Sequence, residues 1–525
     1  MSKQTKRSNG NGSADSPLLQ PAPPLEAASP GAMLLIGTLV LTVIGGWVRA
    51  EFLDHPIRPM EAKVFLDYVA PGSLAEWLNF RSADNMILHT LLVRTVATRW
   101  GFSPYWIRMP ALMAGMLLIP AVGELTRLIS GRRWAALAAG ALVAASGLMI
   151  ELSVTATGHS LLLLWTVLLA IATVYIVRNV AAHRAWMAWA IFGGLGMLTS
   201  PAMLYPIVLL AGVIALQAWI GPAGTPIRRR AMKRLGLTLL GTFLLTLLLY
   251  APVVMHTGFS EFLRVRPFQA RRIDAVPVDI GGIWWIITRH WAVFGKWMWL
   301  LVVVPGLTLA TGWGVVRKRV LPLIGLLGLF LLAVAMLIHG AWSFPGMWYF
   351  LVPLLFSAGA AGWAALPRRE IVVAVSLVIA VVAGLSMAAV EQSDRLIATQ
   401  PRTLTNAEEI LRDAADVPGA ALFASDLHQP TLEYYELLNQ VSAPTDLPPE
   451  RILLVVGPWE RLDETMAEIP QIKTAYGTPQ LWKQYPRAKV YLLRRKPPAT
   501  GPSTTRPVPQ WRKPVPRGLS GPDEI

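Results

Sequence analysis

The chain lacks cysteine altogether, although it is 525 residues long. A disulfide, a thiolate zinc site and a cysteine nucleophile are therefore excluded. Charge is also scarce: 15% of the residues are charged, and acids are the rarer sign, with 31 Asp and Glu against 47 Lys and Arg. The formal net charge of +16 does not indicate a nucleic-acid partner, because basic residues of membrane proteins gather in cytoplasmic loops and tails, and most of those here follow that pattern.

Apolar sequence, by contrast, is abundant. Hydrophobic residues make up 54% of the chain, and the mean hydropathy is +0.48. A soluble protein of this size has no use for so much apolar surface, and several uncharged stretches have the length of about twenty residues that crosses a bilayer core. The sequence therefore predicts a polytopic α-helical membrane protein.

Hydropathy and loop charge together predict about eleven transmembrane helices. Lys3, Lys6 and Arg7 precede the first span, which predicts a cytoplasmic N-terminus, and an odd number of spans then places the C-terminus outside. Five of the resulting inner loops each carry at least two basic residues. The predicted spans are 33–48, 105–129, 135–150, 160–177, 186–198, 203–220, 235–254, one within 296–316, 321–338, 348–365 and 371–389.

Composition divides the chain into four predicted parts. No short apolar segment with a cleavage site precedes the first span, so we expect no cleaved signal peptide. The predicted parts are a disordered cytoplasmic tail (1–32), a transmembrane domain (33–390) with large outer loops at 50–104 and 255–295, a small extracytoplasmic α/β domain (391–496) and a disordered tail (497–525).

The prediction of an α/β domain depends on short apolar runs that alternate with amphipathic segments. ALFAS, RILLVVG and KVYLLRR are bounded by turn residues, as buried strands are, whereas TLEYYELLNQ and WERLDETMAEI have helical periodicity. Asp426, His428 and Glu433 lie around one strand end, where they either bind an acceptor or serve as caps and solvated residues. No Gly-rich phosphate loop occurs there, so nucleotide binding is not indicated.

The segment from Glu51 to Trp100 is the first and richest water-facing stretch. Acids clustered beside an aromatic-rich membrane surface can act as a general base or hold a divalent cation. The alternative is that they are solvated loop residues, helix caps or partners of Lys63 and Arg81. Beyond Glu51 itself, the segment contains five acids and two histidines, namely Asp54, Glu61, Asp67, Glu76, Asp84, His55 and His89.

A divalent metal is one cofactor that this segment could hold. Asp84 and His89 are five residues apart and could share an ion if the backbone bends between them. Two ligands do not make a site, so Glu61 or His55 would have to converge on it. The alternative for His89 is an interfacial side chain on an amphipathic helix.

A second outer segment is basic, against the inside preference of Lys and Arg. Arg264, Arg266, Arg271 and Arg272 lie between the seventh and eighth predicted spans. Arginine pairs bidentately with phosphate oxygens, so these side chains are candidates for binding a lipid phosphate. Contact with anionic lipid headgroups is the alternative.

Two short motifs and one late span resemble a known family. Arg108-Met109-Pro110 and Gly131-Arg132-Arg133 lie in the block from Asp84 to Leu210, and the late span is GMWYFLVPLLFSAGAAG. In their order and spacing they resemble the GT-C superfamily of membrane glycosyltransferases. The nearest resemblance is to the polyprenyl-phosphate-sugar family that includes protein O-mannosyltransferases and the aminoarabinose transferases of lipid A.

The resemblance implies a catalytic acid in the first outer loop. Met60-Glu61-Ala62 stands where the family carries an Asp-Glu-Ala-like triplet, so Glu61 or Asp54 is expected to act as the base. Thr157-Gly158-His159 and Trp348-Tyr349 also depart from family positions that carry Arg and Tyr. Three readings follow: one of these two acids takes over the base, the site has been rebuilt, or transfer activity has been lost.

The sequence thus predicts an inverting hexosyl or pentosyl glycosyltransferase. It would move a sugar from a polyprenyl-phosphate donor to a lipid, glycan or protein acceptor at the outer face of the plasma (inner) membrane. Glu61 would deprotonate the acceptor, and the outer-loop arginines would neutralise the departing phosphate. The alternative is a catalytically degenerate GT-C-like protein that binds a polyprenyl lipid or scaffolds envelope assembly. A secondary transporter is disfavoured, because the spans contain few mid-membrane charges or broken-helix pairs.

Overall fold

A computed structural model describes a large part of the chain. The described residues are 32–70, 85–220, 225–258, 307, 349–364, 404–425, 427–439, 449–457 and 460–496. Several predicted features lie outside them, apart from residues 32 and 307: the spans at 296–316, 321–338 and 371–389, both tails, Asp84, Asp426 and the four arginines from Arg264 to Arg272.

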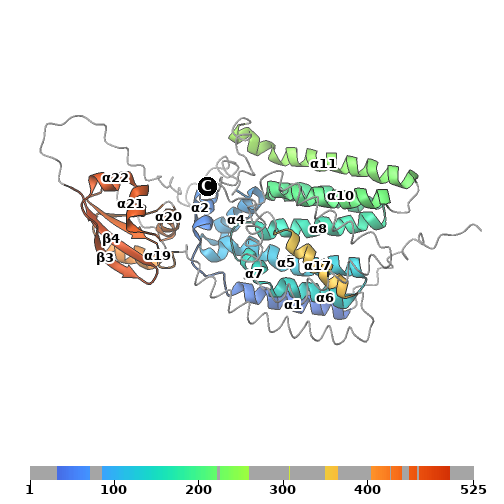
Figure 1. Ribbon diagram of the computed structural model, residues 1–525, viewed down its shortest axis with the longest axis horizontal. Coiled ribbons are helices and arrows are strands. Elements are labelled where there is room, and N and C mark those ends of the chain that lie inside the picture. The colour runs from blue at the N-terminus through green and yellow to red at the C-terminus, as the bar shows by residue number, and fades with distance from the viewer. Residues whose placement is uncertain are drawn as a thin grey trace, which may run out of the picture.

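Long apolar helices dominate the first half of the chain and run along the long axis of the molecule (Figure 1). From α5 to α11 they follow one another after short connections. In chain order they are α1 (Ala32–Ala50), α5 (Pro104–Ser130), α6 (Arg133–Ala145), α7 (Gly147–Ser153), α8 (His159–Arg178), α9 (His183–Thr199), η2 (Pro201–Met203), α10 (Leu204–Ile220), α11 (Thr225–Thr257) and, later, α17 (Leu351–Trp363).

Among the described residues, four helices are long and apolar enough to cross a membrane by length and composition, and a fifth span results if α6 and α7 are counted as one bent helix. The four are helical over 104–130, 159–178, 201–219 and 225–257, and α1 and α17 contribute shorter apolar helices. The protein is therefore a polytopic helical membrane protein. The predicted number of about eleven spans stays a prediction.

The span predicted over 135–150 differs in detail, since it breaks by 64° between α6 and α7. Ser146 is extended at the break, with φ −70° and ψ 118°. The break frees backbone carbonyls that a continuous helix would use. The buried guanidinium of Arg49 donates from Nη1 to the Ala144 carbonyl (3.1 Å) and from Nη2 to the Val143 carbonyl (3.0 Å). Arg49 on α1 thus provides hydrogen-bond donors for the free backbone carbonyls at the end of α6.

Both ends of the helix bundle have a distinct chemical character. Basic residues gather at one end, which we call the basic end: they lie in the turns around 131–133 and 178–184 and in the first part of α11, over 228–234. There the Arg178 guanidinium donates to the Leu128 carbonyl, and that of Arg234 donates to the Val180 carbonyl. The opposite end carries the short helix α2 (Pro59–Val64), and we call it the α2 end.

Three short elements cover the α2 end. Helix α2 continues into the π-helix η1 (Phe65–Val69), and α4 (Ile87–Trp100) follows. The Arg94 guanidinium on α4 donates to the Val69 carbonyl at 2.5 Å, which holds the end of η1. The contact between Arg94 and Val69 joins α4 to η1 at this end of the bundle.

The C-terminal residues form a four-stranded sheet in the order β1-β2-β4-β3. Strands β1 and β2 are parallel, and the other two pairings are antiparallel. The three apolar runs form β1, β2 and β4, while β3 was not predicted. The elements are α19 (Ala407–Ala415), β1 (Ala420–Ala424), α20 (Gln429–Leu438), β2 (Arg451–Val456), α21 (Leu462–Glu468), α22 (Pro470–Ala475), β3 (Gln480–Tyr485) and β4 (Ala488–Arg494).

Helix α20 joins this sheet to the α2 end of the bundle (Figure 1). The Tyr434 hydroxyl donates to the Phe102 carbonyl (2.6 Å), and the Ile57 amide donates to the Tyr435 hydroxyl (3.2 Å). The rings of Tyr434 and Phe65 meet edge to face at 5.2 Å. One hydrophobic cluster therefore spans the membrane region and the α/β region.

Candidate functional site

The centre of the α2 end is a buried ion pair between Glu61 on α2 and Arg108 on α5. Nη2 of Arg108 lies 2.8 Å from Oε2 of Glu61, and its Nε donates to Oε1 at 3.1 Å. The side chains are 0% and 2% exposed respectively. The pair is bidentate, which is the geometry that makes arginine–carboxylate contacts strong and directional.

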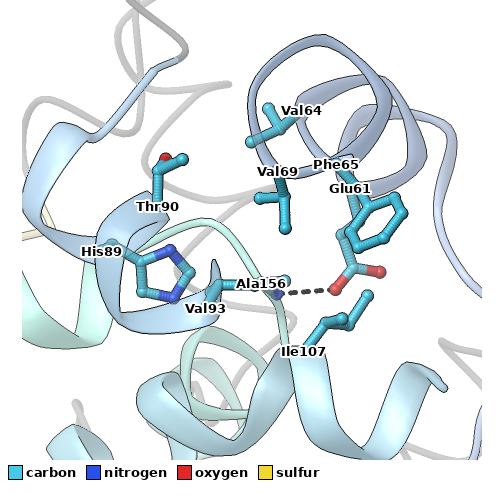
Figure 2. Close-up of a pocket in the computed structure, with 9 residues that line it drawn as sticks. All are labelled: Glu61, Val64, Phe65, Val69, His89, Thr90, Val93, Ile107 and Ala156. Carbon is cyan, nitrogen blue, oxygen red and sulfur yellow. Dashed lines mark hydrogen bonds between the residues drawn. The ribbon is translucent and has the colours of Figure 1, made fainter. Parts of the chain in front are cut away.

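Both carboxylate oxygens of Glu61 also accept backbone hydrogen bonds. Oε1 accepts from the Ala156 amide (2.7 Å), a contact drawn in Figure 2, and Oε2 accepts from the Arg58 amide (3.0 Å). Glu61 therefore receives four N–H groups, about as many as a carboxylate can accept. It fixes the start of α2 and the turn before α8 against α5.

Arg108 completes the same framework on its other side. Its Nη1 donates to the carbonyls of Leu53 (2.8 Å) and His55 (2.7 Å), and its Nη2 to that of Pro56 (3.2 Å). Three backbone carbonyls of the turn that carries Asp54 thereby bind the same guanidinium. The Arg-hydrophobic-Pro motif of the sequence thus supplies the group that organises this end of the bundle.

The electrostatics of Glu61 follow from this packing. Burial alone would raise the pKa of the carboxyl, but the charge and hydrogen bonds of Arg108, together with Arg58 and the Ala156 amide, lower it below the usual value of 4.5. Glu61 is therefore ionised at neutral pH. Its proton affinity is low and its oxygens are occupied, so it is poorly placed to receive a proton from a substrate.

A second carboxylate lies beside this framework. Nη1 of Arg58 donates to Oε1 of Glu151 on α7 at 2.8 Å, and these side chains are 19% and 21% exposed. Arg58 thus contacts both acids, Glu61 through its amide and Glu151 through its guanidinium. Glu151 has no recognisable signal in the sequence, because it is a lone acid near the end of an apolar span.

Three further polar groups gather around the start of α8. The ring of His159 lies 6.0 Å from that of Tyr349, and its Nδ1 is 2.9 Å from the Thr157 hydroxyl. Tyr349 is partly buried at this place. The departure from the family pattern at 157–159 therefore lies beside Tyr349, which keeps the tyrosine of the late pair; the other departure in that pair, Trp348, lies outside the described residues.

A small cavity separates Glu61 from α4 (Figure 2). His89 enters it from α4 and Glu61 from α2, and the remaining lining is mostly apolar. Nε2 of His89 is buried and has no hydrogen-bond partner among the described residues. Burial is the main reason that the pKa of His89 falls to about 4, with a smaller effect of His159. His89 is therefore neutral.

The structure places the residues predicted for the site in different environments. Glu61 is buried, whereas Asp54 lies exposed on the turn around Arg108. Met60, in place of the family acid, is 50% exposed. The predicted metal pair is tested only at His89, since Asp84 lies outside the described residues. Within the described part of the chain, no group of three His, Asp or Glu residues could hold a metal ion.

Comparison with known proteins finds likeness in structure alone. No protein-family profile matches the sequence, and a comparison with curated proteins finds no similar sequence. Among solved structures, the chain is similar to apo ArnT from Cupriavidus metallidurans, with 15% identity, a TM-score of 0.57 and coverage of 87% of this chain and 98% of that chain. The same protein bound to undecaprenyl phosphate matches with 15% identity, a TM-score of 0.55 and coverage of 88% and 98%.

At this level of identity, the likeness shows the fold. Nearly the whole length of the ArnT chain is matched. The chain therefore has the fold of these ArnT structures, which confirms the resemblance in fold that its sequence motifs predict. A more distant likeness, to the oligosaccharyltransferase of Archaeoglobus fulgidus in complex with Zn and sulfate, has 13% identity, a TM-score of 0.48 and coverage of 86% and 72%.

Proposed function

We propose that this protein, with its GT-C fold, is a membrane glycosyltransferase that takes its sugar from a polyprenyl-phosphate donor. The observation that carries the proposal is the cluster of charged and hydroxyl groups at the α2 end of that fold. The structurally similar ArnT has been crystallised with undecaprenyl phosphate, which supports a polyprenyl phosphate as the donor lipid here. The acceptor would be a hydroxyl of a lipid, glycan or protein.

The proposed reaction is a single displacement, which inverts the anomeric carbon. The bond from the sugar carbon to the phosphate oxygen breaks, the acceptor oxygen bonds to that carbon, and a carboxylate takes the acceptor proton. The polyprenyl phosphate leaves as an anion. We propose that Arg264, Arg266, Arg271 and Arg272, which lie outside the described residues, stabilise that anion.

Glu61 and Asp54 are the two acids that the sequence nominates as the base. In the proposed site Glu61 has the positioning role, because Arg108 and two amides occupy its oxygens. A base from the Glu51–Trp100 segment would therefore be Asp54, which is exposed. A divalent metal at Asp84 and His89 would require further ligands, since neutral His89 is buried in a largely apolar cavity.

The proposed location is the plasma (inner) membrane of a bacterium, with the N-terminus in the cytoplasm. The gathering of basic turns at one end of the bundle supports this orientation, because such turns stay on the cytoplasmic side. The α2 end and the α/β region would then face outward. A lipid-linked donor would reach the α2 end from the bilayer, so no soluble nucleotide-sugar site is needed.

Lipid and glycan profiling of a deletion strain tests this function. We expect one sugar to be missing from an envelope lipid, glycan or protein, and its polyprenyl-phosphate form to accumulate. Complementation with the wild-type chain should restore the sugar, and Glu61→Ala should fail to restore it although the protein is made. Glu124→Gln, which alters a Glu–Arg pair near the basic end, is the matched control and should complement fully.

The outcome also separates the proposal from its alternative. If purified protein binds undecaprenyl phosphate while the deletion strain keeps every envelope sugar, the chain is a lipid-binding or scaffold protein and the enzymatic proposal is wrong.

A further inference from the structure

The framework at the α2 end leaves open which carboxylate receives the acceptor proton. Glu61 is 0% exposed and already accepts four N–H groups. Met60, the exposed neighbour on α2, has no proton-accepting group. A transferase with this arrangement needs a carboxylate from another element, and that carboxylate must be reachable by substrate.

Glu151 meets both requirements. Its side chain is 21% exposed, and it lies 2.8 Å from the guanidinium of Arg58, whose amide is bound to Glu61. Its charge acts on Tyr349, which lies two residues before α17. It therefore stands where α2, the start of α8 and the start of α17 converge, on a helix from outside the Glu51–Trp100 segment.

The position of Glu151 depends on the break between α6 and α7. The 64° bend turns the last two turns of the span away from the axis of α6, and α7 lies beside α5 at the α2 end (Figure 1). Besides satisfying the carbonyls at the break, Arg49 donates from Nε to the Ser153 hydroxyl at 3.2 Å. A buried cation thus holds both sides of the break, which is a costly arrangement inside a membrane protein.

We propose that Glu151 is the carboxylate that takes the proton from the acceptor hydroxyl. The inference rests on the proposed glycosyl transfer and names its base. As the acceptor oxygen bonds to the sugar carbon and the carbon–oxygen bond to the lipid phosphate breaks, the acceptor proton moves to a Glu151 oxygen. The protonated carboxyl then returns its proton to water. Arg58 orients the carboxylate before each turnover through their 2.8 Å contact.

The chemistry of the surrounding groups fits a hydroxyl acceptor. Thr157, His159 and Tyr349 supply hydroxyl and imidazole groups close to the Arg58–Glu151 pair. Such groups can form hydrogen bonds that orient a hydroxyl acceptor beside Glu151. In this proposal the exposed Asp54 lies outside the reaction, although its turn is held by Arg108.

The test uses full-length protein in nanodiscs and in the complemented deletion strain. Glu151→Gln keeps the shape of the side chain, and we expect it to lower transfer at least 100-fold, because a positioned base contributes about 10²–10⁴ in rate. The Kd for undecaprenyl phosphate should stay within about threefold of the wild-type value, because a threefold change in Kd is a small change in binding free energy. Glu124→Gln is the matched control that should keep transfer near wild type, and Asp54→Asn tests the other candidate base.

Chemical rescue distinguishes a base from a structural carboxylate. Glu151→Ala should regain transfer when formate is added, because a small carboxylate can occupy the space and accept the proton, whereas formate should not rescue Glu61→Ala. Full transfer by Glu151→Gln would overturn the inference, and loss of transfer in Asp54→Asn with retention in Glu151→Gln would assign the base to Asp54. If the wild-type chain transfers no sugar while the deletion strain keeps its glycans, the proposed function itself fails.

Discussion

The Glu61–Arg108 pair shows how one contact determines the local structure of the α2 end. Each partner is buried, and each also binds backbone groups of separate segments. Replacing a buried pair by apolar side chains can be neutral, but removal of one partner leaves the other charge uncompensated, at a cost of about 3–5 kcal/mol. Loss of Arg108 alone would remove the arginine donor from four acceptor groups. These are the Glu61 carboxylate and the three carbonyls that the guanidinium binds.

We therefore expect Arg108→Met to lower stability by about 3–5 kcal/mol, and Arg108→Lys to recover only part of it, because lysine lacks the planar fork. Thermal unfolding of the detergent-solubilised protein measures the effect. Arg127→Met removes the arginine of the partly exposed pair with Glu124 and should change stability by less than about 1 kcal/mol. Equal losses in the two variants would contradict the assigned role of Arg108.

The pKa of Glu61 leads to a dependence of stability on pH. Its folded pKa lies below the usual value of 4.5, so its contribution is complete above that value and is lost as the pH falls through the folded pKa. Unfolding measured between pH 6 and pH 3 should show this loss in wild type. Glu61→Gln should be less stable at pH 6 and should show a shallower loss below about pH 4.5.

His89 should contribute in a separate pH range. Its pKa is about 4 in the folded protein against 6.5 in the free side chain, so the unfolded chain binds more protons between these values. Stability should fall as the pH drops from 6.5 to 4, by on the order of 3 kcal/mol in total. In His89→Gln that part of the pH dependence should disappear, as measured by unfolding at several pH values. An unchanged slope in this variant would refute a buried, neutral His89.

Among secondary-structure elements, helix α20 links the α/β region to the catalytic end proposed here. Tyr434 and Tyr435 are adjacent but reach different segments, since one binds the Phe102 carbonyl and the other accepts from the Ile57 amide. Ile57 lies two residues before the start of α2. The α/β region is thereby in contact with the segment that carries Glu61.

We expect Tyr435→Phe to loosen the start of α2, because the buried Ile57 amide loses its acceptor at a cost of about 1–3 kcal/mol. Hydrogen exchange should increase for 57–61 and not at the basic end. Tyr491→Phe changes a tyrosine of β4 outside this interface, and it should leave exchange at α2 unchanged. Exchange at 57–61 equal to wild type in Tyr435→Phe would show that α20 does not hold α2.

At the scale of the whole molecule, periodicity and turn chemistry predict most elements but not their meeting points. Each predicted span from 33–48 to 235–254 falls within an observed helix or within consecutive helices (η2 with α10, or the bent pair of α6 and α7), because hydropathy and loop charge are local signals. The pairing of Glu61 with Arg108, 47 residues apart, is not a local signal. The break at Ser146 was not predicted either, because the group that satisfies its carbonyls, Arg49, comes from a different helix. The positioning role that we propose for Glu61 depends on the same kind of non-local contact.

The orientation of the whole molecule can be tested because the chain contains no cysteine. A single introduced thiol is then the only one in the protein, so an impermeant maleimide applied to intact spheroplasts reports its side directly. We expect Lys63→Cys on α2 and Glu464→Cys on α21, both at exposed positions, to be labelled without permeabilisation. Arg132→Cys, exposed in a basic turn, should be labelled only after permeabilisation, because basic turns remain on the cytoplasmic side.

The three positions separate the ways in which the proposed topology could fail. Labelling of Arg132→Cys in intact cells, with protection of the other two, would invert the bundle and place Glu61 and Glu151 in the cytoplasm. Labelling of Lys63→Cys without Glu464→Cys would place α2 and α21 on opposite sides, against the contact between Ile57 and Tyr435. The expected pattern puts the α/β region, Arg58 and Glu151 on the side where a lipid-linked sugar would meet an acceptor from outside the cell.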